Sequence, residues 1–188
     1  MTREEMIAQL GPLGPLAGIW EGGKGGDVAP SDDRGIERNA YRERLVLEPI
    51  GLVENHEQKL HGLRYATTAW RLGEADPFHE EVGYWLWDAA AGQIMRCFMV
   101  PRGVVVMAGG TVEPGARHFR LAAEVGSATF GICSNPFLDR EFRTERYELA
   151  VTLNTDDSLT YEEHTWLKIK GQEKLLDHSD TNTLRRVG

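Results

Sequence analysis

The chain has 188 residues, of which 41% are hydrophobic, enough for one domain with a substantial core. Its 29 Asp and Glu residues outnumber 21 Lys and Arg residues, so the formal net charge is −8. No basic run interrupts this acidity, and binding to nucleic acid through phosphate neutralisation is not expected. No apolar run approaches the ~18 residues of a membrane span, and the first residues lack the apolar core of a signal peptide. We therefore expect a cytoplasmic protein without a membrane partner.

Known catalytic and cofactor motifs are absent from the sequence. Cys97 and Cys133 are the only cysteines, which fits reduced thiols in the cytosol. No Cys-x-x-Cys-His motif occurs, so covalent attachment of a c-type haem is excluded. There is also no Walker loop, nucleophile elbow or His-Glu-x-x-His motif. The catalytic residues, if the protein is an enzyme, are therefore left unassigned.

The chain is predicted to begin with a short helix and a glycine-rich strand. Thr2-Arg3-Glu4-Glu5 has the spacing of a capping box, which predicts a helix within residues 1–12. Gly18-Ile19-Trp20-Glu21-Gly22 follows, with more glycines after it, and this pattern predicts a strand that bends sharply or approaches another backbone. We expect Trp20 to fill one end of the core. A phosphate-binding glycine loop is a weaker interpretation, because no helix pattern follows.

From residue 41 onwards the sequence reads as one short strand after another. Turn residues separate runs such as 63–72, 78–88, 93–100, 118–125, 144–153 and 159–169. Two polar segments, 26–40 and 130–143, are expected to be loop insertions. Because no helix pattern lies between the strands, a parallel α/β sheet is excluded, and a sandwich or a closed antiparallel barrel remains. A closed barrel of this size can enclose one small ligand.

The last predicted strand, residues 174–187, carries a histidine in its middle. On a period of two, His178 shares a face with Leu176 and Leu184, so it points into an apolar region. One interpretation is a core histidine that a neighbour satisfies. The other is a metal or haem ligand, since neutral imidazole is the commonest protein ligand for metals. His164 shares a face with Trp166 and is a candidate second interior histidine, whereas Cys97 reads as a core residue.

The order of these motifs resembles the nitrobindin family of haem-binding β-barrels. The family signature Gly-x-Trp-x-Gly-x-Gly is similar to the stretch that contains Gly18, Trp20 and Gly22. The strand Phe78-His79-Glu80-Glu81-Val82-Gly83-Tyr84 is similar to a second family motif. The resemblance runs from about residue 13 to 187. It implies an all-β fold: an antiparallel up-and-down barrel of about ten strands, lipocalin- or fatty-acid-binding-protein-like, with a short N-terminal helix. Segments 26–40 and 130–143 look like insertions relative to the family, and we expect both to lie at the barrel mouth.

The resemblance further implies a cofactor and an activity. By position, His178 matches the ligand of the iron of a non-covalent b-type haem, and His79 matches a histidine near the distal side. Ferric haem in this family implies binding of nitric oxide and isomerisation of peroxynitrite to nitrate. The sequence departs from the family at Lys24, where the signature has its third glycine, and at Thr67, near a glutamine of many members.

Two other functions remain open on the sequence. The barrel carries a small apolar ligand such as a fatty acid without metal, or side chains fill it and it serves as an interaction module. A monomer and a homodimer are both compatible with the sequence.

Overall fold

The structure is a computed structural model that describes all residues, 1–188. It contains two short helices, α1 (Arg3–Ala8) and α2 (Pro136–Glu141), and a 3₁₀ helix, η1 (Gly11–Leu16). The strands are β1 (Gly18–Pro30), β2 (Ile36–Glu54), β3 (Lys59–Arg71), β4 (His79–Asp88), β5 (Gln93–Val100), β6 (Val104–Thr111), β7 (His118–Val125), β8 (Gly131–Ser134), β9 (Phe142–Leu153), β10 (Ser158–Ile169) and β11 (Leu176–Arg186).

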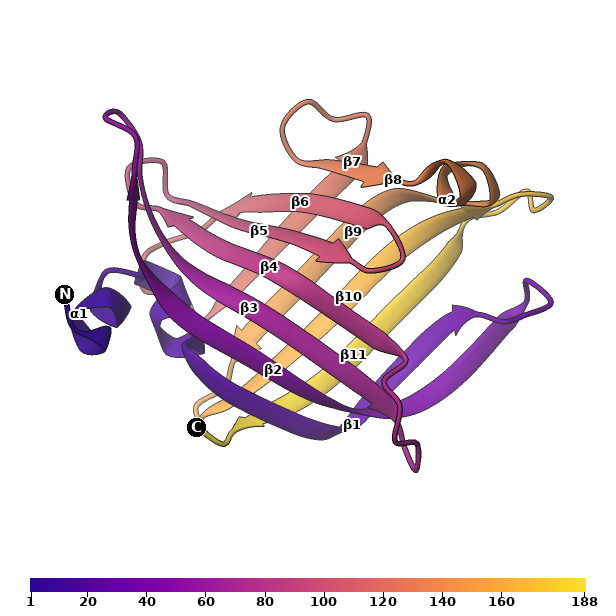
Figure 1. Ribbon diagram of the computed structural model, residues 1–188, viewed down its shortest axis with the longest axis horizontal. Coiled ribbons are helices and arrows are strands. Elements are labelled where there is room, and N and C mark those ends of the chain that lie inside the picture. Colours follow the sequence, from indigo (N-terminus) through magenta and orange to yellow (C-terminus); the bar gives the residue numbers. More distant parts are fainter.

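The eleven strands close into one barrel, in the order β1-β11-β10-β9-β7-β8-β6-β5-β4-β3-β2 (Figure 1). Neighbouring strands pair antiparallel, which confirms the predicted barrel and excludes the sandwich. The count differs from about ten because the four-residue β8 lies between β7 and β6 and pairs parallel with β7. The barrel is therefore up-and-down except at this one place.

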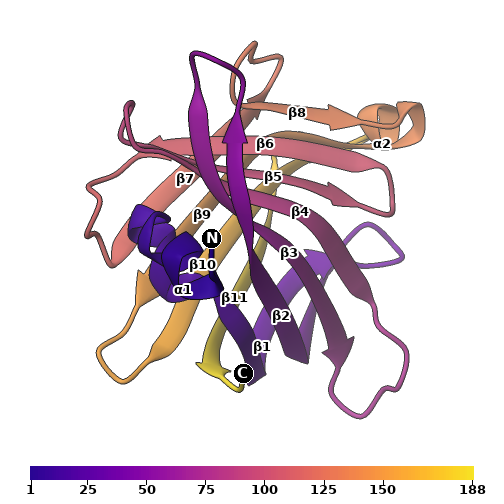
Figure 2. The same cartoon turned by 60° about the vertical axis from the view of Figure 1, so that its left-hand side comes forward.

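The N-terminal segment covers one end of the barrel (Figure 2). The capping box forms as predicted, with the Glu5 amide donating to the Thr2 hydroxyl. Helix α1 ends at Ala8, within the predicted range, and residues 11–16 form the separate 3₁₀ helix η1. Trp20 is fully buried beneath η1 and its indole Nε1 donates to the Leu16 carbonyl at 2.8 Å. This end of the barrel is therefore packed solid, as the interpretation of Trp20 predicted.

Gly22 allows β1 to lie tightly against β11. A Cβ placed on Gly22 would lie 2.6 Å from the Leu184 Cδ2 atom and 2.6 Å from the Thr183 carbonyl oxygen. The pairing of β1 with both neighbours shifts register between residues 21 and 26, where the strand bends. The predicted close approach of backbones is confirmed at this residue.

The two segments predicted as loops, 26–40 and 130–143, are mostly regular structure. Residues 26–30 and 36–40 extend the β1–β2 hairpin, with Ala29 opposite Glu37, and only 31–35 form a turn. The loop prediction for 26–40, made from polar composition, was wrong because residues 26–30 and 36–40 pair with each other through their backbones. Residues 130–143 contain β8 and α2, which begins where Asn135 accepts hydrogen bonds from two backbone amides before Pro136.

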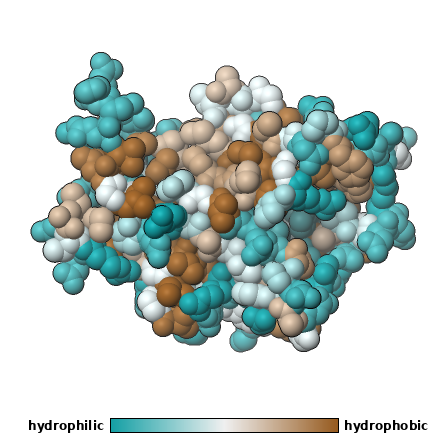
Figure 3. All heavy atoms as spheres, in the orientation of Figure 1, coloured by the Kyte–Doolittle hydropathy of each residue, from teal (hydrophilic) through white to brown (hydrophobic).

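The outer surface is mixed in character (Figure 3). Brown patches in the upper middle of Figure 3 lie over β4, β5 and β6, where Val82, Tyr84, Met99, Val105 and Met107 are exposed. None of the helices in the chain combines the length and the apolar character that a membrane crossing requires.

Candidate functional site: the barrel cavity

The barrel encloses a cavity of about 680 Å³. Every strand except β7 and β8 contributes to its wall, and Leu16 of η1 also lines it. About half of the wall is hydrophobic, with 21 of 41 lining residues. A volume of this size accommodates a small organic ligand, so side chains do not fill the barrel.

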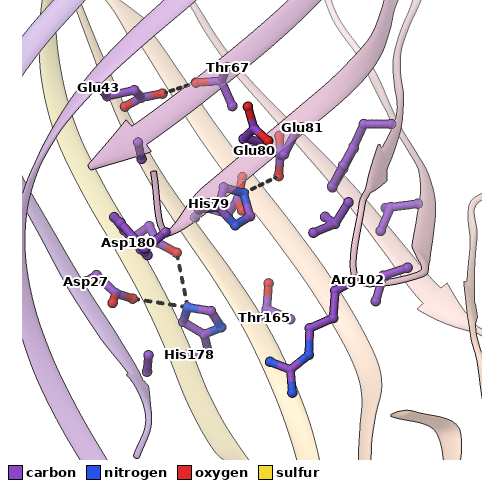
Figure 4. A pocket seen from close by; sticks show the side chains of 18 of the residues that line it. Asp27, Glu43, Thr67, His79, Glu80, Glu81, Arg102, Thr165, His178 and Asp180 are labelled. Carbon is purple, nitrogen blue, oxygen red and sulfur yellow. Dashed lines mark hydrogen bonds and ion pairs between the residues drawn. The ribbon is translucent and has the colours of Figure 1, made fainter. Parts of the chain in front are cut away.

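His178 lies on the inner wall of β11 near the mouth of the cavity. Its Nε2 atom is 3.1 Å from an Asp27 carboxylate oxygen on β1 and 3.5 Å from an oxygen of Asp180 (Figure 4). The second ring nitrogen, Nδ1, makes no hydrogen bond and points towards the space between Thr165 and Arg102. The predicted inward direction of His178 is therefore what the structure shows, with one nitrogen held and the other free.

His178 and the two carboxylates beside it, Asp27 and Asp180, shift one another's pKa. Burial opposes the charge on the imidazole, but the hydrogen bond to Asp27 and the charges of Asp180 and Asp27 raise the pKa of His178 overall. Burial also opposes ionisation of Asp27, but the hydrogen bonds that it accepts from His178 and from Asn39 lower the pKa of this carboxyl. Burial raises the pKa of Asp180 well above its ordinary value, and the charge of His178 offsets this only in part.

His79 lies at the start of β4, with its side chain partly exposed. Its Nε2 atom is 3.3 Å from a carboxylate oxygen of Glu81. Burial opposes protonation, but Glu81 outweighs it and raises the pKa of His79. The inner face of β4 carries His79, Glu81, Trp85 and Trp87. His79 and His178 both face the cavity (Figure 4).

A buried ion network crosses the middle of the barrel. The Arg96 guanidinium is 2.5 Å from Glu81 and 2.7 Å from Glu163, and it also contacts the Tyr147 hydroxyl. Tyr147 donates to Glu163 at 2.6 Å. Burial disfavours the ionised form of Glu81, but Arg96 and His79 lower its pKa to about 2. Glu81 is thus ionised at neutral pH, and Arg96 already donates to two carboxylates and to the hydroxyls of Tyr65 and Tyr147.

A second polar group surrounds Glu43 on β2. Its carboxylate accepts hydrogen bonds from Thr67 at 2.8 Å, Tyr161 at 2.7 Å and Asn182 at 3.1 Å. The Tyr161 hydroxyl also lies 2.6 Å from that of Tyr41. Burial raises the pKa of Glu43, only partly offset by these three donors. Thr67, which stands near the glutamine position of the family, therefore serves to hold Glu43.

Two residues considered from the sequence lie outside the cavity. His164 is on the outer face of β10, where its ring stacks on Trp166 and its Nδ1 is 2.9 Å from Asp177. Tyr161, Glu163 and Thr165 occupy the inner face of this strand instead, so His164 is not a second interior histidine. Cys97 is half-buried on the outer side of β5, where Arg96 and Phe98 face inwards.

The polar interior was largely missed from the sequence. Three strands each carry a tyrosine and a second polar residue two positions later, so that both share one face of the strand: Tyr41 and Glu43, Tyr65 and Thr67, and Tyr161 and Glu163. This repeated pairing of a tyrosine with an acidic or hydroxyl residue was the sequence signal for a polar interior. Asp27 was missed because its segment was predicted to be a loop.

These features define a class of protein: a closed β-barrel with an internal cavity large enough for a small ligand and a histidine on the wall of its last strand. The sequence matches the family described as the THAP4-like haem-binding β-barrel domain over residues 9–186. The chain therefore belongs to this haem-binding family, which is the nitrobindin type, and the resemblance seen in the sequence is confirmed.

Among solved structures, the chain is similar to the crystal structure of Rv2717c from M. tuberculosis. The two share 21% sequence identity and a TM-score of 0.65, over 94% of this chain and 95% of the other. At this identity the similarity shows the fold alone. A comparison with curated proteins finds no match.

Proposed function

We propose that the protein binds a non-covalent b-type haem in the barrel cavity, with His178 as the ligand of the iron. The observation that carries the proposal is the state of the His178 ring, whose Nε2 pairs with Asp27 while Nδ1 faces the cavity without a partner. Histidines that bind metals commonly donate their other ring N–H to a carboxylate, which fixes the ring and raises its basicity.

The rest of the cavity wall supports this proposal. Near the mouth, apolar side chains from several strands and α2 offer contact to a flat apolar ring: Val100, Val104, Leu138, Phe142 and Leu167. Arg71 and Arg102 also line the cavity, and the guanidinium of Arg102 pairs with no carboxylate. Carboxylate substituents on a ligand therefore have a cation available at the rim.

Ferric haem, when bound, supplies an iron centre at which nitric oxide or peroxynitrite binds. In this proposal, Asp27 accepts the Nε2 proton of His178 and holds the ring in one tautomer. His79, whose Nε2 pairs with Glu81, offers a proton donor on another part of the cavity wall. We propose that His79 affects the reaction of peroxynitrite rather than retention of the cofactor. The free thiols Cys97 and Cys133 support a cytoplasmic location.

Titration of haemin into the purified protein tests the proposal. Wild type should give a sharp Soret band, and His178→Ala should weaken haemin binding by more than about tenfold while the barrel still folds. His79→Ala should retain the band and change the rate of peroxynitrite decay. His164→Ala is the matched control, because this histidine lies on the outer face, and should behave as wild type. If His178→Ala binds haemin as tightly as wild type with the same spectrum, His178 is not the ligand.

A carrier of fatty acids is the second candidate, and the cavity volume permits it. The interior charge argues against it, because the buried cation Arg96 already pairs with Glu81 and Glu163. A fatty-acid carboxylate deep in the barrel would meet two carboxylates rather than a free guanidinium. A broad, weak haemin band, together with a fatty acid in extracts of the purified protein, would favour this candidate.

A further inference from the structure

Two carboxylates face each other across the first and last strands at the cavity mouth. Asp27 on β1 is the direct partner of Asp180 on β11 in the antiparallel ladder, and both side chains line the cavity. Like charges directly opposite each other on neighbouring strands destabilise a sheet. His178, two residues before Asp180, shares the same inner face. Burial raises the pKa of Asp180 well above its ordinary value, so the two side chains are stable together either with a proton on Asp180 or with positive charge between them.

The hydrogen bonds of Asp27 and Asp180 bring little positive charge to the two carboxylates. Asp27 accepts from Asn39 at 2.9 Å and from His178 Nε2 at 3.1 Å. Asp180 accepts no hydrogen bond, and the same His178 nitrogen, at 3.5 Å, is its only nearby cationic partner. One imidazole nitrogen thus serves two carboxylates, one of which has no other donor.

The charge of the whole cavity also favours a cation beside Asp27 and Asp180. Eight acidic side chains line it against three arginines and two histidines, so acidic groups outnumber basic ones and the cavity favours cations. Arg96, deep in the barrel, is committed to Glu81 and Glu163. No comparable cation lies beside Asp27 and Asp180.

We propose that Asp27, His178 and Asp180 form a binding site for a small divalent metal ion, separate from the iron of haem. One ligand atom from each residue lies within 4.8 Å of the others, so one ion can contact all three. One imidazole nitrogen and two carboxylate oxygens suit Zn²⁺ and related first-row ions, and three protein ligands leave a position open for water or a small ligand. On binding, the ion takes the place of the proton between Nε2 and the carboxylates, and that proton is released.

Neighbouring side chains already hold one ligand in place. Asn39 donates to the Asp27 oxygen that does not face His178, and the Arg71 Nε atom donates to the Asn39 side-chain oxygen at 3.2 Å. Such outer contacts orient metal-binding carboxylates in characterised sites. The other Asp27 oxygen remains directed at His178.

This site uses a different atom of His178 from the haem proposal, and the two are separable. Haem binding requires the Nδ1 side of the ring and gains nothing from Asp180, whereas the metal site uses Nε2 and requires Asp180. Asp180→Asn should therefore weaken Zn²⁺ binding by about tenfold or more and leave haemin binding unchanged. His178→Ala should abolish both.

Isothermal titration of Zn²⁺ into the metal-free protein tests the inference, with Mg²⁺ as the comparison ion. Wild type should bind one Zn²⁺ with proton release, and Asp180→Asn and Asp27→Asn should each weaken binding by about tenfold or more. His164→Ala is the matched control: this outer histidine also lies between two carboxylates, but Asp177 and Glu162 contact opposite nitrogens of its ring. It should leave the cavity site unchanged.

Each outcome decides the matter. Loss of Zn²⁺ binding in Asp180→Asn, with an unchanged circular dichroism spectrum and an unchanged haemin titration, supports the metal site. Absence of Zn²⁺ binding in wild type, equal binding in Asp180→Asn and wild type, or loss only in His164→Ala overturns it. If Asp180→Asn does not fold, Asp27→Asn, which keeps the partner Asn39, decides instead. Wild type that binds Zn²⁺ but no haemin refutes the haem proposal and leaves this inference standing.

Discussion

Replacement of Arg96 by methionine tests whether the buried ion network stabilises the barrel. Arg96 is 7% exposed and lies between Glu81 and Glu163, so its loss leaves Glu163 without its cation and Glu81 with His79 as its one remaining ion-pair partner. Methionine keeps much of the side-chain volume and the contacts with nearby aromatic rings. The change therefore removes mainly the charge and its hydrogen bonds.

The magnitude follows from two independent arguments. Removal of one partner of a buried ion pair costs about 3–5 kcal/mol, because the other charge stays buried and unpaired. The pKa of Glu81, lowered from 4.5 to about 2 with Arg96 as the main stabilising charge, corresponds to roughly 3 kcal/mol in favour of the ionised carboxylate. We expect Arg96→Met to lower the free energy of unfolding by about 3–5 kcal/mol, or the melting temperature by roughly 6–20 °C.

Urea unfolding of four proteins measures the effect: wild type, Arg96→Met, Glu81→Gln and the double variant. Because both single variants break the same pair, the double variant should be less destabilised than the sum of the two, by about 1–3 kcal/mol. Arg64→Met is the matched control, since Arg64 pairs with Glu48 at 3.2 Å on the exposed face and should cost at most about 1 kcal/mol. Equal losses in Arg96→Met and Arg64→Met, or additive effects in the cycle, would refute this reasoning.

Two further predictions concern the backbone and the pH dependence. Gly22→Ala should lower the free energy of unfolding by about 1–3 kcal/mol, because its Cβ would meet Leu184 and the Thr183 carbonyl. Gly23→Ala is the control and should not destabilise, because no atom lies within 4 Å of its Cβ. Equal melting temperatures of the two variants would contradict this prediction. The lowered pKa of Glu81 gives stability that is fully present above about pH 4.5 and is lost as the pH falls through about 2. The difference in unfolding free energy between wild type and Glu81→Gln should therefore be constant above pH 5 and shrink in more acid solution, and a constant difference down to pH 2 would be inconsistent with the pair.

The fold was predictable because its main signals are local. Alternating strands, turn residues and the glycines around Trp20 each depend on a few neighbouring residues, and together they predict a barrel. The errors arose where pairing, rather than side-chain composition, decides the structure. Residues 26–40 are rich in polar residues and glycine, yet 26–30 and 36–40 form strands because they pair with each other in the β1–β2 ladder. The pair Asn135-Pro136 is a helix-start signal, but the segment 130–143 was predicted to be a loop and the helix α2 was missed.

The site was predictable in part for the same reason. The inward direction of His178 follows from alternation along one strand, and so does the shared face of His79 and Glu81. The contacts of Asp27 with His178 do not follow, because they join the first strand to the last, 151 residues apart in sequence. The pairing of Arg96 with Glu163 likewise requires two side chains to meet across the barrel interior. Such contacts depend on closure of the barrel and its register, which no local pattern contains.

The distribution of charge along the cavity constrains how any ligand enters. In the middle of the barrel, Arg96 and the tyrosine hydroxyls compensate Glu81 and Glu163, so no free cation remains there for an anionic group. Near the mouth, Asp27 and Asp180 are short of positive charge, while Arg102 at the rim has no carboxylate partner. A ligand with an apolar body and acidic substituents is therefore stable only with its apolar part inwards and its acidic groups at the rim. A small cation is instead drawn to Asp27 and Asp180, so the two kinds of ligand meet at opposite nitrogens of the His178 ring.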